Sequence, residues 1–140
     1  MKMISQEMVD EMLKRAEEPE ALAAYKGLNF ALVLVAKDCP GNEDRQVKLG
    51  IKDGKLVNVE ATIKPAPSDL RTALVDKAQL DAKVVSPFDK LTDIVRGKIG
   101  MVSAMRYVKV DGNLPKLLKQ ANGFVALLKY IGTLPIEWGK

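Results

Sequence analysis

The 140-residue sequence contains no histidine. Histidine is the usual general base near neutral pH, the commonest metal ligand and the base of nucleophilic triads, so its absence excludes most hydrolytic and zinc-dependent sites. The single cysteine, Cys39, excludes an internal disulfide and fits a reducing compartment. Outside the N-terminal segment there is no tight acidic cluster for magnesium or acid–base chemistry. We therefore expect a protein that is not an enzyme and uses no catalytic residue, metal or cofactor.

Long apolar runs are missing as well. No stretch approaches the roughly 20 apolar residues that cross a bilayer, and the start, MKMISQEMVDEM, meets acidic side chains too early for a secretory signal. With 47% hydrophobic and 29% charged residues, the chain is expected to be soluble, globular and cytoplasmic. Its length suits one domain over residues 1–140, with N-terminal helices over 1–27, sheet and helices over 28–132 and a tail over 133–140.

Aromatic residues are scarce, with three Phe, three Tyr and one Trp. Proteins that stack nucleic-acid bases need exposed aromatics beside their basic residues, and most of these rings are needed in a core. Gly97 and Gly100 lie between predicted helices and not after a strand, so they do not form a phosphate-binding loop. We therefore expect no nucleic-acid partner.

The net charge of +4 is unevenly distributed along the chain. The first 20 residues carry six acidic and three basic side chains, whereas ten basic residues oppose five acidic ones from Asp81 onward. This asymmetry fits either a solvated surface or an anionic partner. Lys116, Lys119 and Lys129 lie off the apolar stripe of the last predicted helix, so they are the candidates for transient contact with an anionic membrane.

The first half of the chain predicts a central strand and a hairpin. Residues 28–36, LNFALVLVA, are apolar without alternation, as in a strand covered on both faces, and a polar loop, DCPGNED, follows. In the hairpin, a three-residue loop over 52–54 would set Leu49 opposite Val57 and keep the apolar faces together. Gly54 is then expected in a left-handed conformation.

Three segments flank these strands. Ser5 is the expected N-cap of a first helix whose acidic polar face favours packing on the core over membrane contact. The segment 68–78 begins a short helix at Ser68 that is either an insertion or a lid. The tail, TLPIEWGK, either packs over an edge of the molecule or forms a flap over a pocket mouth.

The most informative stretch runs from Asp81 to Leu128. DAKVVS predicts a strand, PFDKLTDIVRGKI a helix capped by Ser86 and ended by Gly97, GMVSAM a second short helix and RYVKV another strand. After the DGN turn we expect one long helix, capped by Asn113. Its apolar stripe consists of Leu117, Leu118, Ala121, Phe124, Val125 and Leu128.

This order of elements, with the Gly97-Lys98 step and the Met-bearing short helix, resembles the sterol carrier protein type 2 family. The hairpin segment LGIKDGKLV is also similar to a segment of that family. The resemblance covers roughly Phe30 to Leu128. It implies an α+β fold in which a curved, mostly antiparallel sheet of about five strands carries helices on one face, with an apolar tunnel or core between them.

What the resemblance implies for function is non-enzymatic binding, and transfer, of a fatty acid, acyl-CoA, phospholipid or sterol-like lipid. The ligand-binding residues that follow from it are Phe88, Leu91, Met101, Met105, Leu117, Phe124 and Leu128. The methionines would serve equally well as adaptable core packing. The alternative is a domain of the same fold with a filled core that acts as an interaction or dimerisation unit, including a homodimer. The sequence does not separate the two, because tunnel walls and cores are both apolar.

Overall fold

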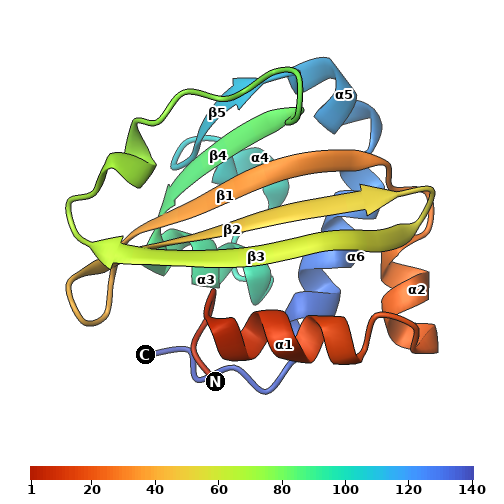
Figure 1. Ribbon diagram of the computed structural model, residues 1–140, viewed down its shortest axis with the longest axis horizontal. Helices are drawn as coiled ribbons and strands as arrows, with labels where there is room; N and C mark the ends of the chain where they lie inside the picture. The colour runs from red at the N-terminus through yellow and green to blue at the C-terminus, as the bar shows by residue number, and fades with distance from the viewer.

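The computed structural model describes residues 1–140, apart from the side chain of Met101. Within this described chain, five strands form one open sheet in the order β3-β2-β1-β4-β5 (Figure 1). The strands are β1 (Phe30–Cys39), β2 (Glu43–Lys52), β3 (Lys55–Pro65), β4 (Ala82–Pro87) and β5 (Lys109–Gly112). The β1–β4 pair is parallel and the other neighbouring pairs are antiparallel. The predicted α+β fold with a mostly antiparallel sheet is therefore confirmed.

The helices lie mainly on one face of this sheet. They are α1 (Gln6–Lys14), α2 (Pro19–Tyr25), α3 (Phe88–Val95), α4 (Met101–Ala104), α5 (Leu114–Lys119) and α6 (Ala121–Gly132), with a 3₁₀ helix, η1 (Asp69–Arg71). Figure 1 shows α3, α4 and α6 behind the sheet and α1 along its β3 edge. Among the described residues, no helix combines the length and apolar character that a membrane crossing requires.

The central strand β1 has apolar cover on both faces, as its sequence predicted. Leu32 and Leu34 face the helices, whereas Val33 and Val35 face the other way and pack with Leu70 of η1. The segment around η1 thus covers the face opposite the helices. It is an added layer on the outside of the sheet and not a lid over the helical side, so the lid alternative was wrong.

A buried carboxylate attaches this outer segment to the sheet. Asp44 of β2 is fully buried, and its oxygens accept hydrogen bonds from the Asp38 N–H, from the Ser68 N–H and hydroxyl, and from the Arg71 guanidinium at 2.7–3.0 Å. Burial alone would raise the pKa of Asp44, but the hydrogen bonds from Arg71 and Ser68 outweigh it and hold that pKa well below its usual range. The carboxylate therefore stays charged and fastens the segment.

A buried lysine makes a second attachment on the same face. The Lys83 ammonium donates to the carbonyl oxygens of Leu70 at 2.6 Å and Ala73 at 2.8 Å. Burial lowers the pKa of this lysine. Ser68 caps η1 as expected, but the helix ends at Arg71 and Leu74 is 92% exposed. The apolar side chain at residue 74 therefore adds nothing to the outer layer.

The hairpin between β2 and β3 differs from its predicted register. Lys52 pairs with Lys55 across a two-residue turn in which both Asp53 (φ 51°) and Gly54 (φ 76°) are left-handed. The register then shifts by one residue at a bulge that leaves Val57 63% exposed. Burial of the apolar face is thus satisfied by the bulge, and not by the three-residue loop that the sequence favoured.

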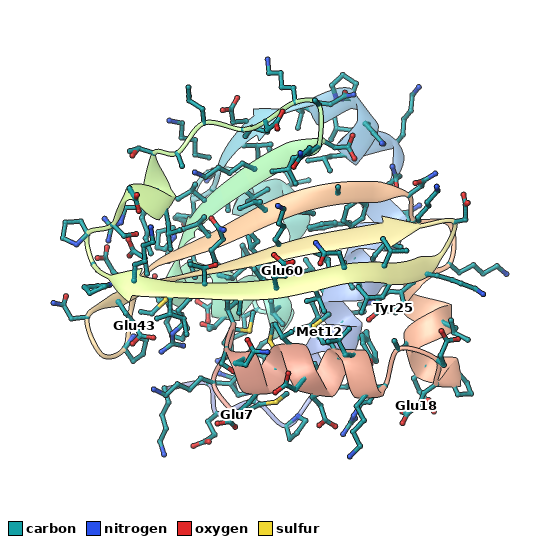
Figure 2. All side chains as sticks on the ribbon, in the orientation of Figure 1. Glu7, Met12, Glu18, Tyr25, Glu43 and Glu60 are labelled. Atoms are coloured by element: carbon teal, nitrogen blue, oxygen red, sulfur yellow. The ribbon has the colours of Figure 1, made fainter. Side chains whose placement is uncertain are left out.

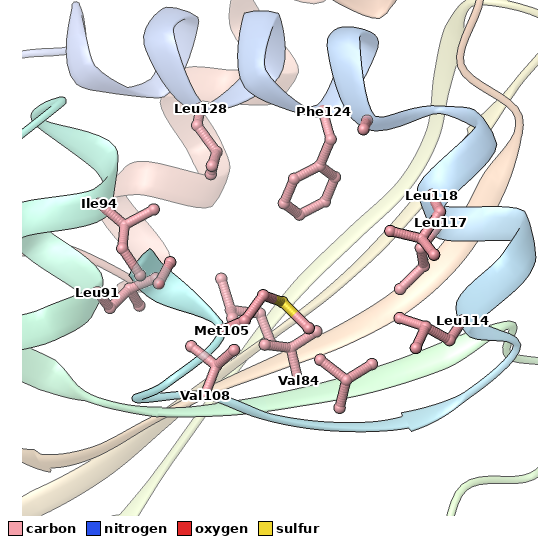
Figure 3. Close-up of a pocket in the computed structure, with 14 residues that line it drawn as sticks. Val84, Leu91, Ile94, Met105, Val108, Leu114, Leu117, Leu118, Phe124 and Leu128 are labelled. Atoms are coloured by element: carbon pink, nitrogen blue, oxygen red, sulfur yellow. The ribbon is translucent and has the colours of Figure 1, made fainter. Parts of the chain in front are cut away.

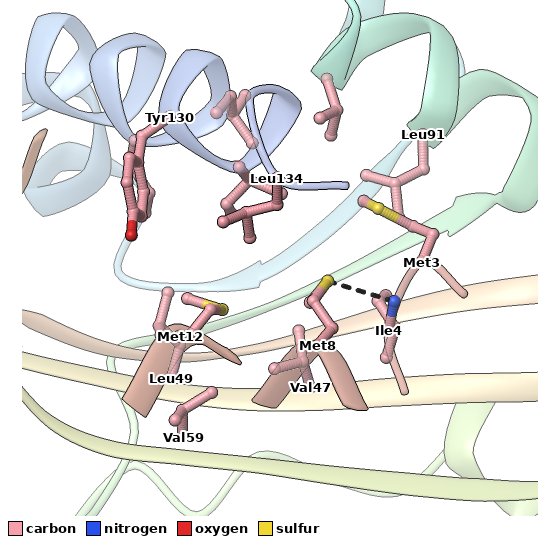
Figure 4. Close-up of a cluster of buried hydrophobic side chains, with 14 of the residues drawn as sticks. Met3, Ile4, Met8, Met12, Val47, Leu49, Val59, Leu91, Tyr130 and Leu134 are labelled. Carbon is pink, nitrogen blue, oxygen red and sulfur yellow. Dashed lines mark hydrogen bonds between the residues drawn. The ribbon is translucent and has the colours of Figure 1, made fainter. Parts of the chain in front are cut away.

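The first helix packs on the core. Ser5 caps α1, with its hydroxyl accepting from the Met8 N–H at 3.2 Å. Met8 and Met12 are buried against the sheet, whereas Glu7 lies on the far side of α1 (Figures 2 and 4). Leu13 of the same helix is 53% exposed and does not join this core.

Two helix boundaries in the second half also differ from expectation. Ser86 does not cap α3, because it is a buried residue of β4, paired with Ala36, and its hydroxyl donates to the Pro87 carbonyl. The expected long C-terminal helix is two helices, α5 and α6, separated at Gln120. The side-chain amide of Gln120 accepts from the Asn29 N–H at 2.8 Å and donates to the Asn29 carbonyl at 3.1 Å, which fixes the break to the start of β1.

The tail packs beside the N-terminus. Leu134 and Ile136 are buried, and the Glu137 N–H donates to the Met1 carbonyl at 2.7 Å. A fully buried arginine, Arg45, joins the two ends. Its guanidinium donates to the carbonyl oxygens of Met3 at 3.0 Å and Lys140 at 2.9 Å.

The pairing of Asp44 with Arg71 and Ser68 predicts a specific pH dependence. We expect Asp44→Asn to lower the free energy of unfolding by about 3 kcal/mol at neutral pH, because the guanidinium loses a buried anionic partner. Since the pKa of Asp44 is lowered by folding, its stabilisation is present above the unfolded-state pKa of about 3.9 and is lost as pH falls toward the folded-state pKa.

Urea unfolding from pH 7 down to about pH 2 checks this. The wild-type protein should lose stability more steeply than Asp44→Asn below about pH 4, and Asp69→Asn, whose carboxylate is exposed, is the matched control. Parallel curves for wild type and Asp44→Asn would contradict the assignment.

Candidate ligand-binding site

An apolar pocket lies between the inner face of the sheet and the helices. Its cavity volume is about 100 Å³ (Figure 3). Every lining residue is apolar: Leu34, Val84, Leu91, Ile94, Ala104, Met105, Val108, Val110, Leu114, Leu117, Leu118, Ala121, Phe124 and Leu128. Because no titratable side chain lines this pocket, it is suited to hold an apolar group and not to carry out acid–base chemistry.

The floor of the pocket is a row of residues across three strands. Leu34 of β1 pairs with Val84 of β4, which pairs with Val110 of β5. Paired residues lie on the same face of a sheet, and here that face is the helical one. Val108, two residues before Val110, continues the same face.

Side chains at helical spacing on α3 and α6 form two walls of the pocket. Leu91 and Ile94 project from one side of α3, and Phe124 and Leu128 from one side of α6. The Phe124 ring packs on Phe30 of β1 with ring centroids 6.0 Å apart. Phe124 is therefore supported from below by the sheet while its other side borders the cavity.

Helix α5 forms the remaining wall and is held mainly at its ends. None of its residues is buried. Asn113 caps it by accepting from the Lys116 N–H at 3.2 Å, the Lys116 ammonium lies 3.0 Å from the Asp81 carboxylate, and Gln120 is bonded to Asn29 at the other end. This wall has less packing behind it than α3 or α6.

The rim of the pocket exposes apolar surface. Leu118 is 62% exposed, Met105 46% and Leu114 38%, although all three line the cavity. The pocket is therefore open at α4 and α5. No residue of the tail, 133–140, lines it, so the flap alternative was wrong and packing over an edge is what the tail does.

Five of the seven predicted ligand-binding residues come together in this pocket: Leu91, Met105, Leu117, Phe124 and Leu128. The side chain of Met101 lies outside the described residues. Phe88 does not line the pocket; it is 7% exposed, and its ring centroid lies 5.4 Å from the guanidinium carbon of Arg45. Phe88 begins α3 one turn before Leu91, which places it beside the buried arginine and beyond the end of the cavity.

Sequence reasoning missed the floor of the pocket and part of the rim. Val84, Val108 and Val110 lie in predicted strands, and strand alternation with a correct pairing register would have placed them on one face. Leu34 was hidden because β1 is apolar on both faces. Leu114 precedes the predicted stripe by one turn and was left out of it.

The three predicted membrane-contacting lysines occupy different places. Lys116 and Lys119 are in the last turn of α5, beside the pocket rim, and Lys129 is in the last turn of α6. Lys116 is paired with Asp81, whereas Lys119 is exposed and forms no ion pair within the described chain. Among the described residues, no group of His, Cys, Asp or Glu is arranged to hold a metal ion.

An α+β sheet with an apolar pocket under its helices is an arrangement that can hold a small apolar group. The solution structure of a conserved hypothetical protein from Thermus thermophilus, proposed to be a sterol carrier protein, matches with a TM-score of 0.69 at 16% identity, covering 94% of this chain and 89% of that one. A crystal structure of sterol carrier protein 2 matches with a TM-score of 0.65 at 16% identity, covering 94% of this chain and 98% of that one. No family model and no curated protein matches the sequence. The chain has the sterol carrier protein 2 fold, which confirms the resemblance at the level of the fold.

Phe124 and Leu127 on α6 offer a matched pair of substitutions. Leu127 is 1% exposed in the core, so Leu127→Ala should cost about 2–5 kcal/mol of unfolding free energy. Phe124 borders a cavity that is already open, so Phe124→Ala should cost about 2 kcal/mol, at or below the lower end of that range, although more atoms are removed.

Chemical denaturation of both variants tests this placement. An equal or larger loss for Phe124→Ala than for Leu127→Ala would mean that Phe124 is an ordinary core residue and that the cavity does not reach it.

Proposed function

We propose that this protein binds the hydrocarbon chain of a lipid in the pocket between the sheet and α3–α6, and carries it without chemical change. The observation that supports this most strongly is a cavity lined by 14 apolar residues that remains open at an apolar rim. In a filled core the apolar lining residues would be buried, whereas Leu118 and Met105 face the cavity and are also exposed. The likeness of the fold to sterol carrier proteins supports the same proposal.

The size of the cavity sets a condition on binding. A volume of about 100 Å³ is smaller than the roughly 150 Å³ of a protein cavity that binds one benzene molecule. A fatty-acid chain is several times larger, so a long chain enters only if a wall moves. Helix α5 is the wall to move, because none of its residues is buried and it is held at its two ends.

The lining also limits how the ligand lies. Every side chain in the pocket is apolar, so a hydroxyl, carboxylate or phosphate inside it would lose its hydrogen bonds to water without replacement. The polar end of the ligand therefore stays at the rim, near α4 and α5, and the hydrocarbon part points toward Leu91 and Leu128. This orientation favours amphiphiles with a single polar end.

The second candidate function is an interaction or dimerisation domain without a ligand, as the small volume of the cavity would also allow. Mass spectrometry of organic extracts from the purified protein separates the two. A stoichiometric lipid supports the carrier, and repeated empty extracts together with a dimer in light scattering support the interaction domain.

Affinity should depend on the length of the chain. We expect micromolar binding of fatty acids or acyl-CoA, tightening by up to roughly fourfold per added methylene between C8 and C16, because each buried methylene contributes about 0.8 kcal/mol. Titration calorimetry on the chain-length series measures this directly.

A variant that fills the pocket and a control variant at the next residue test whether the fatty acid binds in the pocket. Ala121→Phe should fill the cavity and remove most of the binding, whereas Asn122→Phe, one residue further on the exposed side of α6, should leave it unchanged. Affinity that is independent of chain length, or equal losses in both variants, would exclude the pocket as the binding site.

The hydrogen bonds of Gln120 should control how fast the pocket opens. Gln120→Ala removes both bonds to Asn29, each worth about 1 kcal/mol, so α5 moves more easily and a fluorescent fatty acid should load and leave up to roughly thirtyfold faster. Stopped-flow fluorescence gives both rates, and Asn122→Ala is the control on the same stretch. Unchanged rates in Gln120→Ala would show that α5 is not the moving wall.

A further inference from the structure

Exposed apolar side chains gather where the pocket opens. Met105, Leu114 and Leu118 line the rim, and Val102 lies one helical turn before Met105 and is 89% exposed. We call these four residues the mouth face. An apolar surface of this kind beside a pocket marks a site of contact with another molecule.

The chain segments that carry the mouth face are mainly basic. From Arg96 to Lys119 the sequence contains six basic residues and one acidic residue, Asp111. Val108 and Val110 face the pocket, so strand alternation turns Lys109 and Asp111 of β5 to the other face of the sheet. The acid is therefore directed away from the mouth face.

Two of the basic residues are next to the mouth face and are available to bind an anionic partner. Arg106 follows Met105 and Lys119 follows Leu118, and both are exposed. Within the described chain, neither forms an ion pair. In contrast, the Arg96 guanidinium lies 5.3 Å from the Trp138 ring, and Lys116 is paired with Asp81.

The opposite edge of the molecule is acidic. The first 20 residues carry six acidic side chains, and α1 lies along β3, at the edge of the sheet farthest from β5 and α5 (Figures 1 and 2). A negatively charged plane would therefore attract the mouth face and repel α1, which orients the molecule before contact.

Charge decides which partner fits the mouth face. In a twofold dimer the same patch of both copies meets, so the Arg106 and Lys119 side chains of both copies would bring four unpaired cations into one interface and repel. A bilayer with anionic headgroups instead accepts exposed apolar side chains between its headgroups and pairs the surrounding cations with its phosphates.

We propose that the mouth face docks on an anionic lipid bilayer, with Val102, Met105 and Leu118 entering the headgroup region and Arg106 and Lys119 contacting lipid phosphates. This proposal rests on the proposed function in one respect, namely that the pocket opening is the place where a lipid enters. Docking in this orientation points the opening at the bilayer, so a hydrocarbon chain passes into the pocket without crossing water.

Reversing the charges of Arg106 and Lys119 tests whether these side chains bind the bilayer. Arg106→Glu combined with Lys119→Glu should weaken co-sedimentation with vesicles of phosphatidylcholine and phosphatidylglycerol by at least about tenfold, because each basic residue near an anionic surface contributes about fivefold. Lys2→Glu combined with Lys14→Glu makes the same change in net charge near α1 and should have little effect. Binding of the wild-type protein should be absent on pure phosphatidylcholine and lost by roughly 0.5 M salt. Equal weakening by both pairs would overturn the proposal, because net charge alone would then explain the binding.

A probe at Val102 tests insertion. Val102→Cys labelled with an environment-sensitive fluorophore should shift its emission to the blue on anionic vesicles, whereas Val57→Cys, labelled on β3 and 63% exposed in the unmodified protein, should not shift. Cys39 is buried and does not compete for the label. A shift at Val102→Cys that appears without vesicles and rises with protein concentration, matched by dimers in light scattering, would overturn the bilayer in favour of a second copy.

A titration without vesicles separates docking on the bilayer from lipid binding in the pocket. Arg106→Glu combined with Lys119→Glu should bind a fluorescent fatty alcohol in vesicle-free buffer within about twofold of wild type, since neither residue lines the pocket and this ligand carries no charge. Intact vesicle docking by a wild-type protein that binds no fatty acid would remove the carrier function and keep the docking surface. Fatty-acid binding without vesicle docking would do the reverse.

Discussion

The two-sided apolar character of β1 is the constraint on which the rest of the structure depends. Leu32 and Leu34 face one way, and Val33 and Val35 the other, so the strand is stable only where both faces are covered. The helices cover the first face. The second is covered by the segment around η1, which contributes Leu70. A chain of this length provides few apolar residues for the second face, and polar attachments hold that layer in place.

One of these attachments, Asp44 of β2, is followed in the chain by a second buried charged residue, Arg45. Successive side chains of a strand point to opposite faces, so Asp44 and Arg45 serve different sides of the sheet. Asp44 binds Ser68 and Arg71 on the outer face, and Arg45 binds the carbonyl oxygens of Met3 and Lys140 on the helical side. Both side chains are fully buried, and buried charges are tolerated only when they are bonded in this way. A pair of charged residues thus fixes both the outer layer and the two ends of the chain.

The pocket arises where apolar cover is incomplete. Over most of the inner face, α1, α3 and α6 bury the sheet, but next to β4 and β5 the cover is the short helix α5, which buries none of its residues. The row Leu34, Val84 and Val110 is therefore left facing a cavity. The same lack of packing leaves Leu118 exposed and is the reason why we propose α5 as the wall that moves. The cavity, its opening and the part of the mouth face formed by Leu114 and Leu118 thus share one origin, which is the light packing of this helix.

The sequence by itself determined the elements and their class. The absence of histidine is read directly from the composition. Local propensity and periodicity predict the other features, which are the apolar run of β1, the caps at Ser5 and Asn113 and the spacing of Leu117, Phe124 and Leu128. Tertiary structure alone decided the β2–β3 register, where a bulge at Val57 and not the loop aligned the faces, and the break at Gln120, which depends on Asn29 some 91 residues away. It also decided that Phe88 lies beside Arg45 and that Val84 and Val110 form a floor. Each of these depends on which strand or side chain becomes the neighbour, and contacts between residues distant in the chain leave no periodic signal in it.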